Sequence, residues 1–267
     1  MNILYLGDIM GEPGIALVER ELAALRRDYK VDVVIAQAEN TTEGRGISLQ
    51  DFARLRKAGV DFCTGGNWSL WRDEIIPAMS DPAQPIVRPA NYPSSTPGLG
   101  YKYLDMPKGR VLVVSLLGQI VGRDADKLVD NPLKTIDAIL AQEQSVAKVA
   151  TVVNFHGDFS SEKVIIGHYL DGRASMVVGD HWHVPTADGR VLPGGTAHQT
   201  DVGMCGVLNA SLGITFESVL PRWHDGVQTR NVLAKGGPLQ LNGLLATIDT
   251  TTGLATEAKT INRVFER

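Results

Sequence analysis

The chain has 267 residues, of which 43% are hydrophobic and 21% are charged, a composition typical of a globular protein with a sizeable core. Its 26 Lys and Arg residues against 30 Asp and Glu residues give a net charge of −4. We therefore do not expect duplex DNA as a partner, because DNA binding depends on neutralising phosphates. The sequence has two cysteines and no apolar run that approaches the ~18 residues of a membrane span, so we expect a cytoplasmic protein without a membrane segment.

The first part of the chain alternates short apolar runs with amphipathic stretches, which is the pattern of βαβ units in a mainly parallel sheet. It predicts strands at 2–7, 32–37 and 60–65 and helices at 14–28 and 48–58. Ser48 is the expected N-cap of the second helix, and Gly59 lies just beyond its end.

A proline-rich stretch at 82–100 interrupts this pattern and predicts a loop that carries a small excursion from the core. The later elements are strands near 101–105, 110–116, 149–155 and 175–179 and helices near 132–143 and 160–170. Short segments at 196–200, 229–235, 240–248 and 254–264 then suggest an antiparallel second sheet. No repeat or linker divides the chain, so we expect one domain over 1–267.

Five of the predicted strands are followed at once by side chains that can bind metal. These are Asp8, Glu39, Asn40, Asn67, His156, His181 and His183. Ligands of open α/β sheets bind beyond the carboxyl ends of the strands, so these side chains are expected at one edge. Their oxygen and imidazole donors suit two divalent metals, iron, manganese or zinc, with Glu39 able to bridge them. Taken singly, each residue could equally be a helix cap or a hydrogen-bonded core residue.

Several short motifs occur in a fixed order: GD at 7–8, AEN at 38–40, TGGN at 64–67, RPANYP at 88–93, NFH at 154–156, SEK at 161–163, HWHVPTAD at 181–188 and TDVGM at 200–204. In these motifs the chain resembles the YmdB-like branch of the bacterial calcineurin-like metallophosphoesterases over residues 1–215. The resemblance implies an α/β fold, a four-layer αββα sandwich of the calcineurin-like metallophosphoesterase type. It also implies a dinuclear centre, usually iron or manganese, and a metal-bound hydroxide that hydrolyses phosphodiesters such as 2′,3′-cyclic or 3′,5′-cyclic nucleotides.

The resemblance also assigns the ligands of the two metals. Residue by residue, one metal is held by Asp8, Glu39, Asn40 and His183, and the other by Glu39, Asn67, His156 and His181.

One position departs from the family in a way that bears on catalysis. Trp68 stands where the family has a histidine that serves as the general acid, and an indole N–H cannot deliver a proton near neutral pH. His198 and Asp158 are candidates to replace this acid, whereas His168 lies in a predicted helix and is expected to be structural. Trp68 could instead stack a nucleobase or pack in the core.

Three further residues are candidates to bind the substrate phosphate: Arg45, Arg88 and Asn91. The main hypothesis is a metal-dependent phosphodiesterase whose partner is a cyclic nucleotide or another small phosphodiester, in a chain that forms homo-oligomers by analogy with its family. The first alternative is a metal-bound nucleotide sensor with weakened catalysis, which Trp68 favours. The second is a metal-dependent enzyme with a different reaction.

Overall fold

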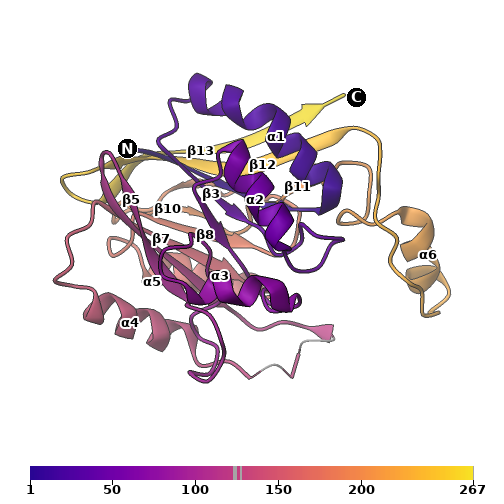
Figure 1. The fold of residues 1–267 in the computed structure, drawn as a ribbon, viewed down its shortest axis with the longest axis horizontal. Helices are drawn as coiled ribbons and strands as arrows, with labels where there is room; N and C mark the ends of the chain where they lie inside the picture. The colour runs from indigo at the N-terminus through magenta and orange to yellow at the C-terminus, as the bar shows by residue number, and fades with distance from the viewer. Residues whose placement is uncertain (123–124, 127, 267) are drawn as a thin grey trace.

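The computed structural model describes residues 1–122, 125, 126 and 128–266 and consists of four layers (Figure 1). Two sheets face each other in the middle, and helices cover the outer face of each sheet. The helices are α1 (Gly11–Asp28), α2 (Leu49–Ala58), α3 (Ile76–Ser80), α4 (Pro132–Gln142), α5 (Ser160–Tyr169) and α6 (Phe216–His224), with a 3-10 turn η1 (Asp73–Ile75). This arrangement is the αββα sandwich that the resemblance implied.

The first sheet has the strand order β2-β11-β12-β1-β3-β4, with β13 along the other edge of β12. Its strands are β1 (Asn2–Leu6), β2 (Asp8–Ile9), β3 (Val33–Gln37), β4 (Phe62–Thr64), β11 (Met204–Val207), β12 (Leu239–Asp249) and β13 (Leu254–Phe265). Strands β1, β3 and β4 run parallel, so their carboxyl ends meet at one edge.

The second sheet has the order β5-β6-β7-β8-β10-β9. Its strands are β5 (Tyr101–Met106), β6 (Gly109–Leu117), β7 (Ala150–His156), β8 (Met176–Asp180), β9 (Arg190–Val191) and β10 (Ala197–Gln199). Strands β6, β7, β8 and β10 are parallel, which brings the ends of β7 and β8 together.

Three apolar layers hold the sandwich together. Alternate residues of β1, such as Ile3 and Tyr5, face the second sheet, whereas Leu4 and Leu6 face α1 and α2. A third layer packs α4 and α5 against the outer face of the second sheet. Both sheets are thus covered on two sides, which explains why β3 and β7 are buried along their whole length.

The local signals for the helices were largely correct. The Ser48 hydroxyl accepts a hydrogen bond from the amide of Asp51, and Gly59 ends α2 with a φ of 106°, a conformation that favours glycine. Helix α1 begins at Gly11 rather than at residue 14, since the amide of Gly14 already donates to the carbonyl of Met10 and the amide of Gly11 donates to the carbonyl of Asn40.

The prediction for the C-terminal part was wrong in two respects. The hairpin of β12 and β13 does not form a second sheet but extends the first one, since β12 pairs antiparallel with β1. The second sheet comes instead from residues 101–199. Residues 229–235 are not a strand, and the preceding residues form α6, which stands at the side of the molecule (Figure 1).

None of the helices in the described residues is long and apolar enough to span a membrane.

Candidate metal centre

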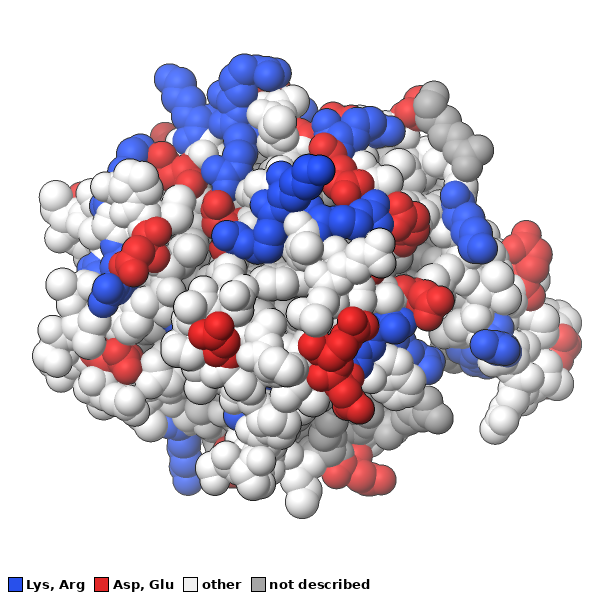
Figure 2. Space-filling model, viewed as in Figure 1, with Lys and Arg blue, Asp and Glu red and all other residues white. Residues whose placement is uncertain are grey.

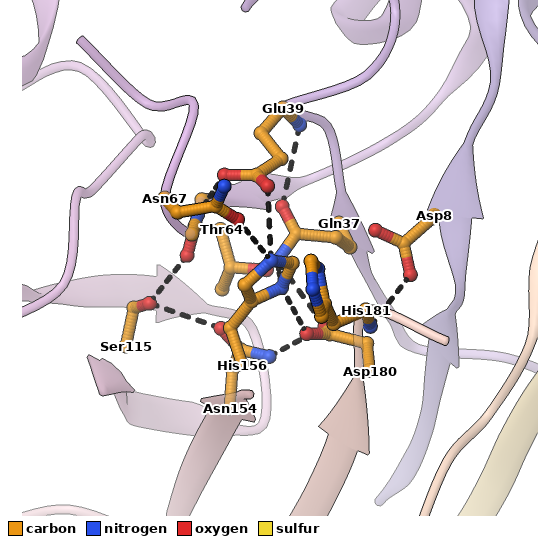
Figure 3. A network of polar contacts seen from close by, with 12 residues as sticks. Asp8, Gln37, Glu39, Thr64, Asn67, Ser115, Asn154, His156, Asp180 and His181 are labelled. Carbon is orange, nitrogen blue, oxygen red and sulfur yellow. Dashed lines mark hydrogen bonds and ion pairs between the residues drawn. The ribbon is translucent and has the colours of Figure 1, made fainter. Parts of the chain in front are cut away.

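The predicted metal-binding side chains converge where the carboxyl ends of both sheets meet (Figure 3). Asp8 begins β2, Glu39 follows β3, Asn67 follows β4, His156 ends β7 and His181 follows β8. All except His181 are buried. Glu39, His156 and His181 place ligand atoms within 4.8 Å of one another.

His156 is held in one orientation by a carboxylate behind it. Its Nδ1 lies 2.7 Å from Oδ1 of Asp180, so Nδ1 carries a proton that it donates to this carboxylate. Its Nε2 then points to Oε1 of Glu39 at 3.0 Å and to Oδ1 of Asn67 at 2.9 Å. A buried histidine whose second nitrogen donates to a carboxylate is the usual arrangement of a metal ligand.

Glu39 is fixed by the loop that follows β4. Its Oε2 accepts hydrogen bonds from the amides of Gly66 and Trp68, which leaves Oε1 directed toward His156. Gly66 is required for this approach, because a Cβ at that position would lie 2.2 Å from the His156 ring. The loop therefore brings Glu39 and His156 close enough to share a ligand.

His181 and His183 both adopt positive φ angles, 101° and 63°, which are uncommon for residues other than glycine. Nδ1 of His183 donates to the carbonyl of Leu212 at 3.1 Å, which leaves Nε2 3.7 Å from Oδ1 of Asp8. The amide of His181 donates to Oδ2 of Asp8, and its ring lies 4.4 Å from the ring of His156. The turn after β8 thus presents two imidazoles to the same site.

The fit of this cluster to metal ions follows from its unpaired oxygens. Among the buried side-chain oxygens of the described residues, Oδ1 of Asp8 and Oδ1 of Asn40 accept no hydrogen bond, and Oε1 of Glu39 is approached by Nε2 of His156 at 3.0 Å without a well-formed hydrogen bond. Buried acceptors without donors are costly. Each of these oxygens belongs to a predicted ligand, so the donor set fits cations bound between them.

The pKa shifts of Asp8 and His156 also fit a site for cations. Burial and the nearby charge of Asp180 raise the pKa of Asp8 well above its ordinary value. Burial opposes the charged form of His156, but the carboxylates of Glu39 and Asp180 raise its pKa well above the ordinary value. Acceptors that crowd together in this way need either protons or cations between them.

Asp180 is a functional residue that the sequence analysis did not identify. Its Oδ2 accepts hydrogen bonds from the hydroxyl of Tyr5 at 2.8 Å and from Nδ2 of Asn154 at 2.5 Å, and its Oδ1 accepts from His156. The available signal was its place beside the HWH motif at the end of a buried strand. Asp180 positions His156.

The buried ion pair of Lys163 and Asp201 is a second feature that the sequence did not reveal. Nζ of Lys163 donates to Oδ2 of Asp201 at 2.7 Å, and neither side chain is exposed. Asp201 also accepts from the amide of Trp182, between the two histidines. The ion pair thereby supports the turn that carries both imidazoles.

A cleft with a volume of about 1060 Å³ opens onto the cluster. Asn40, His181 and His183 line it together with Arg45, Trp68 and others. The guanidinium of Arg45 lies 4.8 Å from the ring of Trp68 and 5.4 Å from the ring of Trp71. Arg45 is therefore placed where it can meet a bound anion.

Arg88 and Asn91 are not brought to the cleft. Arg88 is buried and donates to the carbonyls of Pro89, Thr96 and Pro97, so it holds the proline-rich loop in place. Asn91 donates to the carbonyls of Leu117 and Asp130 and accepts from the amide of Leu117. Both side chains use their polar groups on backbone, and a role in phosphate binding has no geometric support.

His198 is not among the residues that line the cleft. It lies on β10, its Nδ1 donates to the carbonyl of Val177, and its ring packs against Gly167 of α5, where a Cβ would come within 2.5 Å.

Asp158, in contrast, lines the cleft, with Oδ1 3.3 Å from Nε2 of His181. Burial opposes ionisation of Asp158, but hydrogen bonds from His181 and the amide of Val121 lower its pKa. Of the two candidate acids, Asp158 is thus the one that lies at the cleft.

Comparison with known proteins agrees with this fold. A 2′,3′-cyclic-nucleotide 2′-phosphodiesterase of Bacillus subtilis is 36% identical over 261 residues, covering 98% of this chain and 96% of the relative. The crystal structure of a phosphatase from Mycoplasma pneumoniae matches with a TM-score of 0.91 and 30% identity, covering 100% of this chain and 94% of that one. A protein of Thermus thermophilus matches with a TM-score of 0.88 and 34% identity, covering 100% and 99%.

The four layers and the cluster at the strand ends define a metallophosphoesterase-like fold. The family model described as YmdB-like protein matches residues 4–261, and the chain belongs to this family. The expected enzyme class, a phosphoric diester hydrolase, is confirmed by relatives named phosphodiesterase and phosphatase.

Proposed function

We propose that the chain is a phosphodiesterase that uses two divalent metal ions and hydrolyses 2′,3′-cyclic or 3′,5′-cyclic nucleotides or another small phosphodiester. The observation that supports this proposal most directly is the set of buried oxygens without a well-formed hydrogen bond on Asp8, Glu39 and Asn40, beneath a cleft lined by His181 and His183. The sequence similarity to a cyclic-nucleotide phosphodiesterase supports the substrate class.

The side chains fall into two ligand groups around Glu39. Asp8, Asn40 and His183 would hold one ion with Glu39, and Asn67, His156 and His181 would hold the other with Glu39. When bound, the two ions supply Lewis-acid stabilisation of the phosphoryl oxygens and activation of water. Oxygen and imidazole donors without a thiolate favour iron or manganese, with zinc as the third choice.

The residues around the ligands keep them in position for this chemistry. Asp180 fixes the tautomer of His156, and the carbonyl of Leu212 does the same for His183. Among the described residues that line the cleft, no side chain other than the two histidine ligands has an ordinary pKa near neutrality. We therefore expect an activated aryl phosphodiester to be hydrolysed more readily than a cyclic nucleotide, whose alkoxide leaving group needs an acid.

A nucleotide sensor is the second candidate, and Trp68 is the observation that favours it. Trp68 lines the cleft at the position that the resemblance assigns to the general acid, and its indole cannot act as one. Such a protein would bind metal and nucleotide with little turnover. Its location in the cytoplasm, its single domain and its self-association remain predictions.

The test compares hydrolysis of bis(p-nitrophenyl) phosphate and 2′,3′-cyclic AMP by manganese-loaded protein. We expect about two metal ions per chain by elemental analysis, and loss of both metal and activity in Asp8→Ala and His156→Ala. His168→Ala, at an exposed position on α5, is the matched control and should retain activity. Nucleotide binding without turnover would favour the sensor, and a protein that cannot be loaded with manganese or iron would refute both functions.

A further inference from the structure

The cleft above the metal centre is basic, although the protein as a whole is acidic. Within the part of the chain that the structure describes, five cationic residues line it: Arg45, Arg72, Arg222, Arg230 and Lys235. Two acidic residues, Glu43 and Asp158, line it as well, in a chain with a net charge of −4. Lys and Arg atoms are visible at the hollow between the body and the part that carries α6 (Figure 2). A positively charged cleft concentrates anionic ligands.

Two of these cations already have structural partners. Arg72 donates to the carbonyls of Thr42 and Arg45 and pairs with Glu43. Arg222 donates from Nη2 to Thr229 and Asn231, on either side of Arg230. Arg222 thus ties the segment after α6 to the helix and fixes the backbone that presents Arg230.

Arg230 and Lys235 are different, because their side chains have no hydrogen bond or ion pair with any described residue. Both are exposed and belong to the segment after α6, whereas Arg45 and Trp68 belong to the loops after β3 and β4. The cleft therefore has two cationic walls from distant parts of the chain, and only one of them borders the aromatic rings of Trp68 and Trp71.

The size of the cleft also exceeds the needs of a small substrate. Its volume of about 1060 Å³ lies at the top of the range of about 300–1,000 Å³ that is usual for sites of drug-sized ligands. A mononucleotide with its phosphate at the metal centre would leave part of this space unfilled.

We propose that Arg230 and Lys235 form a subsite for a second phosphate of a 2′,3′-cyclic substrate. In such a nucleotide the second phosphate is attached through the 5′ oxygen, because the 2′ and 3′ oxygens belong to the diester at the metal centre. This inference rests on the proposed function, because the metal centre takes the first phosphate. The ligand class is a nucleotide with at least two phosphate groups. The second group is either a terminal 5′-phosphate or the internucleotide phosphate of an oligoribonucleotide.

The test measures binding, not turnover, by isothermal titration calorimetry with manganese-loaded protein at low salt. The three probes are 3′-AMP, adenosine 3′,5′-bisphosphate and a diadenylate with a 3′-phosphate. The double variant Arg230→Gln/Lys235→Gln is compared with Lys134→Gln, which removes an exposed cation on α4 outside the cleft.

We expect wild type and Lys134→Gln to bind the bisphosphate about three- to tenfold more tightly than 3′-AMP, as expected for partly exposed ion pairs, and the difference should shrink in high salt. The double variant should bind both equally and keep the wild-type affinity for 3′-AMP, which also shows that it folds. Preference for the diadenylate over the bisphosphate would identify the internucleotide phosphate as the source, and the reverse would identify the terminal one.

Equal affinity for all three probes in wild type, or a preference that survives in the double variant, would overturn the subsite. A preference that depends on Arg230 and Lys235 in a protein that hydrolyses no phosphodiester would support the subsite and count against the proposed function alone.

Discussion

Oδ1 of Asp180 lies 2.7 Å from Nδ1 of His156, at the point where β7 and β8 end side by side. The register of these parallel strands pairs the two residues directly, so the contact is set by the sheet and not by a flexible loop. Tyr5 and Asn154 donate to the other oxygen of Asp180, which satisfies the buried carboxylate. The orientation of a predicted metal ligand is therefore built into the core of the protein.

Asp180→Asn should weaken metal binding about 10- to 100-fold, as is usual when the group behind a histidine ligand is changed. The asparagine amide can donate where the carboxylate only accepts, and this favours the tautomer with the proton on Nε2. The measurement is the manganese dissociation constant by calorimetry. Asp171→Asn, at a partly exposed turn after α5, is the control. An unchanged manganese affinity in Asp180→Asn would remove the positioning role.

Metal binding should release protons and strengthen as the pH rises. The pKa of His156 is raised by Glu39 and Asp180 against the effect of burial, and the pKa of Asp8 is raised by burial. Both groups hold protons in the metal-free protein to higher pH than usual, and a cation must displace them. For each displaced proton the apparent affinity should rise up to about tenfold per pH unit below the raised pKa. Calorimetry in buffers of different ionisation enthalpy counts the protons. An affinity that is flat between pH 6 and 8 would contradict the expectation.

Much of the site could be predicted because each ligand stands directly after an apolar run. The strand ends in a parallel sheet share an edge, so Glu39 and Asn67 had to lie near one another once the strands of the first sheet were recognised. His156 ends a strand of the second sheet and meets them because the two sheets pack face to face. The roles of Asp180 and Lys163 could not be predicted, because they depend on register and on packing between distant elements.

The errors in the fold have a similar cause. Alternating residues at 240–248 and 254–264 identify a hairpin but do not say which sheet it joins, and that is decided by the pairing of β12 with β1. His198 lies on β10 and packs against Gly167, and the sequence does not show which face of that short strand is buried.

Trp68→His should raise the rate of 2′,3′-cyclic AMP hydrolysis relative to that of bis(p-nitrophenyl) phosphate. An imidazole at this rim of the cleft can protonate an alkoxide leaving group, a contribution of about 10²- to 10⁴-fold, whereas the aryl ester needs little help. The ratio of kcat/KM values for the two substrates is the readout, and Trp68→Phe is the control because it keeps an aromatic ring without an acid. A ratio that stays the same in Trp68→His would show that proton donation at residue 68 does not limit the reaction.

Removing one partner of the Lys163–Asp201 ion pair should lower the free energy of unfolding more than replacing both partners with uncharged residues. Lys163→Met leaves the charge of Asp201 buried without its partner, which destabilises a protein by about 3–5 kcal/mol. Asp201 also accepts from the amide of Trp182, so the same change should loosen the turn of His181 and His183 and lower manganese affinity. In Lys163→Met/Asp201→Asn no charge remains, and the amide oxygen can still accept from the backbone. We therefore expect the free energy of unfolding of the double variant, from denaturant titration, to lie above that of Lys163→Met. If the losses of unfolding free energy in Lys163→Met and Asp201→Asn add up to the loss in the double variant, the two residues are not coupled, because contacting residues normally deviate from additivity.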